Sequence, residues 1–243
     1  MMKRAAKKIL EAMGFELRRV NYKFEPKKKD RFKWIRDLDI RTVLDVGAHT
    51  GEFAAEIHAI LPQATIYSFE PLREIYDVLV ERMSQLPKFQ AFHFALGSEA
   101  SETEIHRSVE HTPSSSILRM DSLHKRAFPF TSKDVLEKIV IKRLDDVAGD
   151  LELAENILIK LDVQGFEDKV ILGGPKTIQM AKLLIVETSF ESLYIGQPLF
   201  DTIYEMMRRM GFAYHGNFSQ LLNPIDGNIL QADAIFVKRP SLA

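Results

Sequence analysis

The stretch Val43-Leu-Asp-Val-Gly-Ala-His-Thr-Gly51 decides the fold. Its apolar first half predicts a short buried strand with Asp45 at its carboxyl end, and its second half predicts a glycine turn that leads into a helix. Gly47 lets the backbone turn without a Cβ clash, and Gly51 lets the following helix pack close to the strand. In an open α/β sheet, a unit of this kind forms a nucleoside-sized crevice beside the N-terminus of a helix.

The segment Ile66-Tyr-Ser-Phe-Glu-Pro71 predicts a second apolar strand, which ends on Glu70 and Pro71. An acid at the end of the second strand is the usual partner of ribose hydroxyls in such folds. Glu70 follows Asp45 by 25 residues, close to the roughly 20 expected. The turn and the acid together indicate a nucleoside site, whereas an ordinary tight turn would explain the glycines alone.

The glycine pattern also indicates which cofactor fits. A dinucleotide pyrophosphate favours G-x-G-x-x-G, but this turn places His49 where the second glycine is expected. Because that glycine serves the close approach of phosphates, a cofactor without phosphates fits better, and we expect S-adenosylmethionine. The turn residues expected at the cofactor are Gly47, Ala48, His49, Thr50 and Gly51.

Length and composition are typical of one α/β domain. The chain of 243 residues is 46% hydrophobic, contains no cysteine and carries a net charge of −1. Disulfides, thiolate metal sites and a cysteine nucleophile are therefore excluded, and we assign no metal ligands. The chain lacks an apolar run of about 18 residues, and its basic N-terminus lacks the apolar core of a signal peptide, so we expect a cytoplasmic protein.

Residues 1–36 form a basic N-terminal extension, with thirteen Lys and Arg against four Asp and Glu. We expect a helix over 1–13 and an extended piece over 15–24, ahead of a main domain at 37–243. Two interpretations stay open: contact with an anionic membrane surface or lipid-linked acceptor, or a packed helix with a solvated basic face. Because the body of the chain is acidic and lacks an aromatic-basic stripe, no nucleic-acid partner is expected.

The main domain alternates strands and helices, which is typical of a parallel sheet. The expected strands cover 42–46, 65–69, 89–95, 156–161, 183–186, 212–215 and 234–238, and the expected helices cover 51–61, 72–85, 167–172 and 199–210. A mostly parallel sheet of seven strands, with a closing antiparallel hairpin and helices on both faces, is the outline of the class I methyltransferase Rossmann-like α/β fold. The dinucleotide-binding outline has six strands.

A long insertion at 99–150 separates the third and fourth strands. It contains two hairpin-like pieces, 102–107 and 138–143, on either side of Ser114-Ser115-Ser116. A loop of this length in a compact domain is often a lid or a binding loop. A hairpin without a binding role is the equal alternative.

A second group of candidate residues lies in Ile159-Lys-Leu-Asp-Val-Gln-Gly-Phe-Glu167, where a buried strand ends in Asp162. Glu187 ends the next expected strand. Because ligands bind outside the carboxyl ends of such strands, these two acids are expected to flank the crevice, where they could accept a proton from a hydroxyl or bind a cation. The alternative for Asp162 is a helix cap. For Glu167 we favour stabilisation of the first helical turn.

In these motifs the chain resembles the FkbM-type S-adenosylmethionine-dependent methyltransferases, over about residues 40–238. The matching segments are 44–51, 69–71, 95–97, 114–118, 143–146, 159–165, 186–187 and 233–236. The family often has Glu where this chain has Gln164, which leaves that position without a base. Acceptors differ among its members, so the fold does not name the substrate.

The resemblance implies O-methylation of a hydroxyl on a sugar, glycolipid or polyketide-like acceptor, as in polysaccharide biosynthesis. Asp162 is the first choice for the proton acceptor and Glu187 the second. The implied cofactor contacts are Asp45 and the turn at 47–51 with the methionine part, Glu70 with the ribose, and Ala95 and Leu96 with the adenine. Two alternatives remain. His49 argues against an NAD(P)-dependent oxidoreductase, and Gln164 keeps open a non-catalytic cofactor-binding protein.

Overall fold

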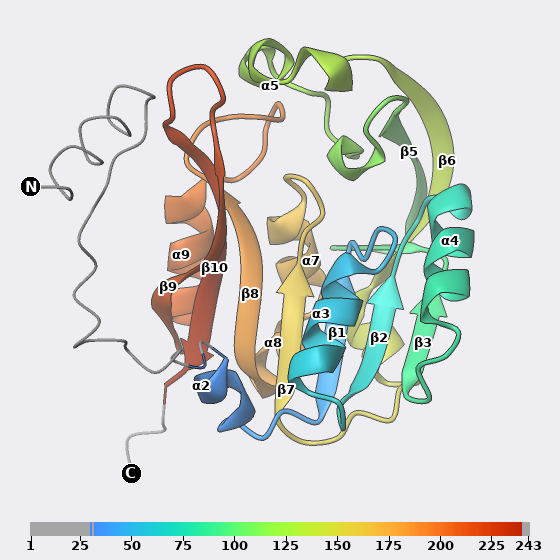
Figure 1. The fold of residues 1–243 in the computed structure, drawn as a ribbon, viewed down its shortest axis with the longest axis vertical. Coiled ribbons are helices and arrows are strands. Elements are labelled where there is room, and N and C mark those ends of the chain that lie inside the picture. The colour runs from blue at the N-terminus through green and yellow to red at the C-terminus, as the bar shows by residue number, and fades with distance from the viewer. Residues whose placement is uncertain (1–29, 31, 240–243) are drawn as a thin grey trace, which may run out of the picture. The chain divides into compact units, whose positions relative to one another are not determined.

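A seven-stranded sheet forms the centre of the computed structural model, which describes residues 30 and 32–239 (Figure 1). Its strands are, in spatial order, β3 (Phe89–Phe92), β2 (Thr65–Phe69), β1 (Thr42–Val46), β7 (Ile157–Leu161), β8 (Ala181–Ser189), β10 (Ile229–Lys238) and β9 (Phe212–Leu222). All are parallel except β10, which runs antiparallel to β8 and β9. The class I methyltransferase outline is therefore confirmed. The helix expected over 1–13 and the extended piece over 15–24 lie outside the described residues.

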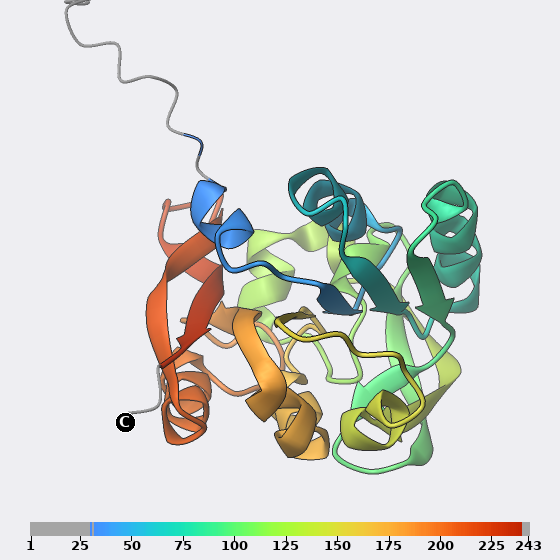
Figure 2. The ribbon, with the colours of Figure 1, turned by 90° about the horizontal axis from the view of Figure 1, so that it is seen from below.

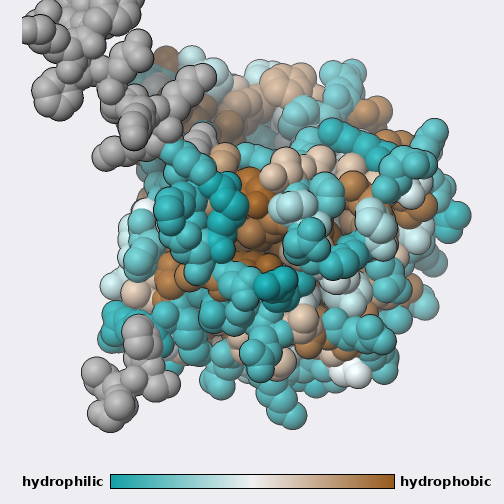
Figure 3. Space-filling model, turned by 60° about the horizontal axis from the view of Figure 1, so that its bottom comes forward, coloured by the Kyte–Doolittle hydropathy of each residue, from teal (hydrophilic) through white to brown (hydrophobic). Residues whose placement is uncertain are grey.

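Helices cover both faces of this sheet (Figure 2). On one face lie α3 (Glu52–Ile60) and α4 (Arg73–Met83), and on the other lie α8 (Pro175–Met180) and α9 (Phe200–Arg209). The short helices are α2 (Lys33–Arg36), α6 (Leu144–Ala148) and α7 (Glu167–Gly173). Hydrophilic residues cover most of the surface seen in Figure 3, and hydrophobic residues gather near the middle of that view.

The two central strands, β1 and β7, are buried along their whole length. Leu44 and Ile159 of these strands belong to the main core together with Ile203 and Met207 of α9. Ile203 and Met207 are one helical turn apart and so share a face of α9. Because side chains alternate along a strand, Asp45 points to the sheet face opposite Leu44, the face that α3 covers.

The third strand ends earlier than the sequence suggests. β3 stops at Phe92, and β4 (Ala95–Gly97) pairs with the insertion instead of continuing the main sheet. Gly97 permits this pairing, because a Cβ at that position would lie 2.8 Å from Cγ2 of Ile141. The prediction of one strand over 89–95 is therefore wrong, and Ala95 and Leu96 belong to a different sheet.

The fifth strand of the main sheet is longer than expected. β8 continues to Ser189 because β10 pairs with it over this length. Glu187 therefore lies inside the strand, opposite Asp233. The prediction that Glu187 ends this strand is wrong. The strands β9 and β10 are also longer than the expected 212–215 and 234–238, since they form an extended hairpin with each other.

The insertion at 99–150 builds a second sheet with the strand order β4-β6-β5. β5 (Ser101–Ser108) and β6 (Asp134–Arg143) pair antiparallel, which confirms the two hairpin-like pieces. Between them lie η2 (Thr112–Ser114), α5 (Ser122–Ala127) and η3 (Pro129–Thr131). This part of the chain lies beyond the arrowheads of β1, β2 and β7, at the carboxyl edge of the main sheet (Figure 1).

Candidate active site

A cavity of about 760 Å³ opens where β1, β2 and β7 end. Its walls come from the glycine turn, the chain after β2, β4, the insertion around η2, and the turn between β7 and α7. Of the predicted site residues, it brings together Gly47, His49, Glu70, Pro71, Ala95, Leu96 and Asp162. Asp45, Ala48, Thr50, Gly51 and Glu187 do not line it. This volume includes the opening to solvent. The position of the cavity, outside the carboxyl ends of parallel strands, is typical of a ligand site in an open α/β sheet.

The glycine turn is fixed by its backbone. Gly47 has a φ of +82°, and a Cβ there would lie 1.8 Å from the carbonyl oxygen of Asp162. Gly51, with a φ of +86°, precedes α3, and a Cβ there would lie 2.8 Å from Cδ1 of Leu79. A side chain at Gly47 would therefore collide with the chain after β7, as expected of a turn that needs glycine, and one at Gly51 would push α4 away. The sequence pattern predicts that Gly51 serves the packing of the following helix, α3, whereas the close contact is with α4.

Glu70 is buried against the same turn, with 5% of the residue exposed. Its carboxylate accepts hydrogen bonds from the backbone N–H of His49 at 3.0 Å and of Leu72 at 2.8 Å. Burial raises the pKa of Glu70 to about 7, although these two bonds oppose the shift. The carboxylate is thus held rigidly and keeps lone pairs for further donors, such as the two hydroxyls of a ribose.

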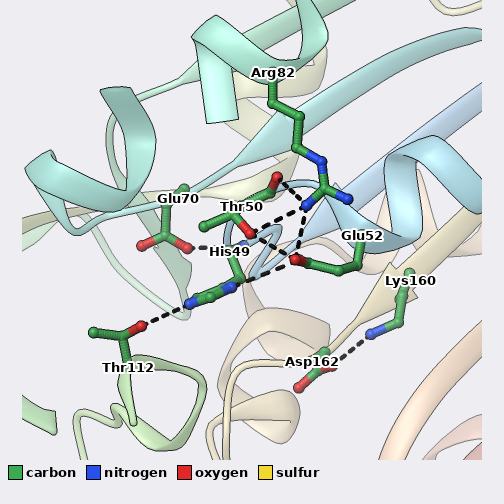
Figure 4. Close-up of polar contacts among 8 residues, drawn as sticks. All are labelled: His49, Thr50, Glu52, Glu70, Arg82, Thr112, Lys160 and Asp162. Atoms are coloured by element: carbon green, nitrogen blue, oxygen red, sulfur yellow. Dashed lines mark hydrogen bonds and ion pairs between the residues drawn. The ribbon is translucent and has the colours of Figure 1, made fainter. Parts of the chain in front are cut away.

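His49 connects the turn to the insertion (Figure 4). Its Nε2 lies 2.8 Å from Oγ1 of Thr112, and its Nδ1 lies 3.6 Å from Oε2 of Glu52. Burial lowers the pKa of His49, against the pull of Glu52. Arg82 of α4 completes the arrangement, donating to Glu52 at 2.8 Å and to the carbonyl oxygen of Thr50 at 3.2 Å. The turn is therefore braced from two sides.

Asp45 lies beneath the turn and is 1% exposed. One carboxylate oxygen accepts a hydrogen bond from Ser68 at 3.1 Å, and the other, Oδ1, is buried without a hydrogen-bond partner in the described part of the chain. Burial raises the pKa of Asp45 to about 6, and the ammonium of Lys160, its neighbour on β7, opposes this shift. Any effect of Asp45 on a ligand therefore passes through the turn above it.

Gln164 joins the two candidate catalytic acids. Its side-chain amide donates to Oδ1 of Asp162 at 2.8 Å and to Oε2 of Glu187 at 2.9 Å. Lys160 donates to the other oxygen of Asp162 at 2.6 Å. The two acids predicted to flank the crevice therefore form one network, in which Asp162 lines the cavity and Glu187 does not.

The surroundings push the pKa values of these acids apart. Burial by itself raises the pKa of Asp162, but the Lys160 ammonium and the bonds from Lys160 and Gln164 outweigh it and hold this pKa below its ordinary value. Burial, followed by the negative charges of Asp162 and Glu167, raises the pKa of Glu187 well above its ordinary value. Asp162 is thus held in the ionised form that a proton acceptor requires.

The acid network is tied to the insertion through Gln164. The Tyr194 hydroxyl, which is fully buried, lies 2.8 Å from Oε1 of Gln164 and 3.1 Å from the carbonyl oxygen of Ser114. The Ser116 hydroxyl donates to the Gln164 carbonyl oxygen at 2.6 Å. A displacement of the insertion would therefore reach the side chain that orients both acids.

Glu167 accepts hydrogen bonds from the backbone of the turn between β7 and α7. It is 3% exposed, and its Oε1 accepts from the N–H groups of Val163 at 2.9 Å and Gly165 at 3.2 Å. It also lies in the first turn of α7, as expected for helix stabilisation. The alternative that Asp162 caps this helix is wrong, because the cap position is Phe166 and no side chain bonds there.

Among the residues of this site that were not found from the sequence are Thr112, Lys160 and Tyr194. Lys160 does carry a signal, since a lysine inside an otherwise apolar buried strand needs an ionic partner, and Asp162 is two residues away on the same strand face. Thr112 and Tyr194 lie in segments without a periodic pattern, so their positions depend on the tertiary structure.

The chain is similar to known proteins in sequence and in fold. A family model described as the methyltransferase FkbM domain matches residues 45–214. The 2-O-methyltransferase NoeI of Sinorhizobium fredii is 26% identical over 170 residues, 68% of this chain and 70% of that protein. The AMB antimetabolite synthetase AmbE of Pseudomonas aeruginosa is 24% identical over 218 residues, 76% of this chain but 10% of AmbE.

Among solved structures, magnesium protoporphyrin IX methyltransferase of Synechocystis PCC 6803 with bound SAM aligns over 98% of this chain and 97% of that one, with a TM-score of 0.43 and 11% identity.

Within residues 30 and 32–239, no helix is long and apolar enough to cross a membrane. The same residues contain no group of three or more His, Asp or Glu side chains arranged to hold a metal ion.

Proposed function

Because the chain belongs to the FkbM methyltransferase family, we propose that it transfers a methyl group from S-adenosylmethionine to a hydroxyl of a sugar, glycolipid or polyketide-like acceptor. One observation carries the proposal: the same cavity is lined by Glu70 and by Asp162. A nucleoside anchor and a proton acceptor in one cavity are what methyl transfer to a hydroxyl requires.

The cofactor would be held along the glycine turn. Glu70 would accept hydrogen bonds from the ribose hydroxyls, because two backbone N–H groups already fix its carboxylate. Ala95 and Leu96 would supply the apolar wall beside the adenine, and the turn at 47–51 would face the methionine part, with Asp45 supporting it from beneath. When bound, the cofactor supplies an activated methyl group, so the protein has mainly to align the acceptor and exclude water.

Asp162 would accept the proton of the acceptor hydroxyl. One of its oxygens accepts a hydrogen bond from Lys160 and the other accepts one from Gln164. The orientation of the carboxylate is therefore fixed, and lone pairs remain for the acceptor hydroxyl. Glu187 is the second candidate for this role. Its raised pKa favours the protonated form, so it would act only after losing a proton.

The acceptor itself is assigned by class. The name of NoeI, a 2-O-methyltransferase, supports oxygen as the atom that receives the methyl group. The insertion at 99–150 would cover the acceptor, since it contributes Thr112 and Ile117 to the cavity wall. A cover of this kind excludes water from the transfer. The basic segment 1–36 would matter for an anionic or lipid-linked acceptor and be dispensable for a soluble one.

The direct test is a transfer assay with S-adenosylmethionine carrying a labelled methyl group and a panel of saccharide and polyketide-like acceptors. We expect label on an acceptor oxygen, identified by mass spectrometry. S-adenosylhomocysteine should bind and inhibit, and NAD should do neither, which separates methyl transfer from the oxidoreductase alternative. Binding of S-adenosylhomocysteine without transfer to any hydroxyl would instead favour the non-catalytic cofactor-binding protein.

A further inference from the structure

A second cavity lies on the other side of one insertion segment. The segment 113–118 runs between the two cavities, and its residues alternate between them. Pro113, Ser115 and Ile117 line the cavity described above, whereas Ser114, Ser116 and Leu118 line the second one. The second cavity spans about 850 Å³, its open mouth included.

Two cations without ion-pair partners line this second cavity. Arg119 and Lys125 are exposed at its wall, and neither side chain forms an ion pair within the described part of the chain. The one acid in the wall, Asp134, already pairs with His106. The cavity therefore presents net positive charge, which suits an anionic ligand.

The second cavity is adjacent to the proposed reaction centre. Ser116, which lines it, donates to the Gln164 carbonyl oxygen at 2.6 Å. Gln164 in turn donates to Asp162 at 2.8 Å. A single residue, Gln164, therefore links this wall to the acid network, so a group bound in the second cavity lies close to the proposed reaction centre.

We propose that this second cavity binds a negatively charged substituent of the methyl acceptor, a carboxylate or a phosphate ester. The inference rests on the proposed function and narrows its substrate class to acidic or phosphorylated saccharides. Arg119 would supply a planar two-pronged donor and Lys125 a point charge. Because both cations are exposed, each contact is expected to change affinity by about threefold to fivefold.

The test measures anion binding separately from activity. Inorganic phosphate, D-glucuronate and the neutral control D-glucose are titrated into the full chain with bound S-adenosylhomocysteine, at constant ionic strength, and followed by amide NMR shifts. We expect saturable shifts at residues 114–120 with phosphate or glucuronate and none with glucose. The phosphate and glucuronate arms show which anion the cavity prefers.

Variants identify the cations responsible. Arg119→Ala and Lys125→Ala should each weaken anion binding by about threefold to fivefold, whereas Arg126→Ala should leave it unchanged. Arg126 is the matched control, because it follows Lys125 on α5, interacts with the charge of Asp121, and does not line the cavity. Unchanged S-adenosylhomocysteine affinity establishes that each variant is folded. Equal loss in all three variants, or no saturable binding, would overturn the inference.

A transfer assay then compares two saccharide acceptors that differ only in a uronate carboxylate. We expect wild-type protein to prefer the acidic one and Arg119→Ala to reduce this preference by about threefold to fivefold. Equal transfer to both acceptors by wild-type protein would overturn the anion subsite and leave the proposed methyl transfer intact. Saturable anion binding in a protein that methylates no acceptor would leave the anion site standing and defeat the proposed function.

Discussion

The two ends of the cavity are built in different ways. The Glu70 end comes mainly from one continuous stretch, 45–72, with Ala95 and Leu96 of β4 beside it. It is held largely by backbone, with two glycines in left-handed conformations and two N–H groups on one carboxylate. The Asp162 end is assembled from β7, β8, the insertion and the loop around Tyr194, and side-chain hydrogen bonds hold it. Under the proposed function, the first end would hold the cofactor and the second would hold the acceptor.

This contrast predicts that Asp162→Asn has the largest effect and that it falls on turnover. The variant keeps the shape of the side chain but cannot accept the proton, so turnover should fall by roughly 10²–10⁴-fold, the usual scale for a lost general base. Steady-state rates with a saturating acceptor measure this. Asp168→Asn is the matched control, because that carboxylate pairs with Lys169 and does not line the cavity. If turnover of Asp162→Asn stays within a few-fold of wild type, Asp162 is not the proton acceptor and Glu187 becomes the candidate.

Glu70→Ala should have the next largest effect, and it should fall on cofactor binding. Removing a charged acceptor from the ribose hydroxyls should weaken S-adenosylhomocysteine binding by about 1.5–3 kcal/mol. Calorimetric titration measures the change. Glu74→Ala is the control, because the Glu74 side chain is 80% exposed. A dissociation constant that stays the same in Glu70→Ala would remove the ribose assignment.

Replacements of Gln164 test whether its amide orients Asp162 and Glu187. Gln164→Ala removes the donor that orients Asp162 and Glu187, so turnover should fall by about tenfold with little change in cofactor affinity. Gln164→Glu puts a third carboxylate beside these acids, which should raise the pKa of Asp162 and shift the acid limb of the pH–rate profile upward. A loss of turnover without such a shift in Gln164→Glu would mean that Gln164 acts on packing alone.

The smallest expected effect is the pH dependence of cofactor binding. The pKa of Glu70 is about 7 without ligand, and its ionised form is the better acceptor for ribose hydroxyls. As pH falls through 7, Glu70 gains a proton that binding must remove, so affinity for S-adenosylhomocysteine should fall by up to about tenfold per pH unit. In Glu70→Gln this slope should disappear. An equal slope in that variant would assign it to Asp45, whose pKa is raised to about 6.

The sequence predicts the Glu70 end better than the Asp162 end for a physical reason. The turn between Gly47 and Gly51 is a local pattern, because backbone conformation and helix packing require glycine at fixed spacing. Its contacts then follow from the neighbouring strand that ends at Glu70. The parallel part of the main sheet also follows from the alternation of strands and helices.

The other end depends on contacts between distant segments. Gln164 meets Glu187 and Tyr194 only after β8 and the following loop have folded beside β7, and no local pattern encodes those distances. The separate strand β4 and the extension of β8 through Glu187 arise in the same way, because their pairing partners β6 and β10 lie far along the chain. The sequence therefore identified both acids but could not show that an amide joins them.

The most direct test of the division between the two ends measures both properties on both variants. S-adenosylhomocysteine affinity and single-turnover methyl transfer at saturating S-adenosylmethionine are determined for Glu70→Ala and Asp162→Asn. We expect Glu70→Ala to lose affinity and keep its single-turnover rate within a few-fold, and Asp162→Asn to keep affinity and lose the rate. If both variants lose affinity and rate together, the cavity does not contain a cofactor end and a catalytic end, and the separate roles of Glu70 and Asp162 are wrong.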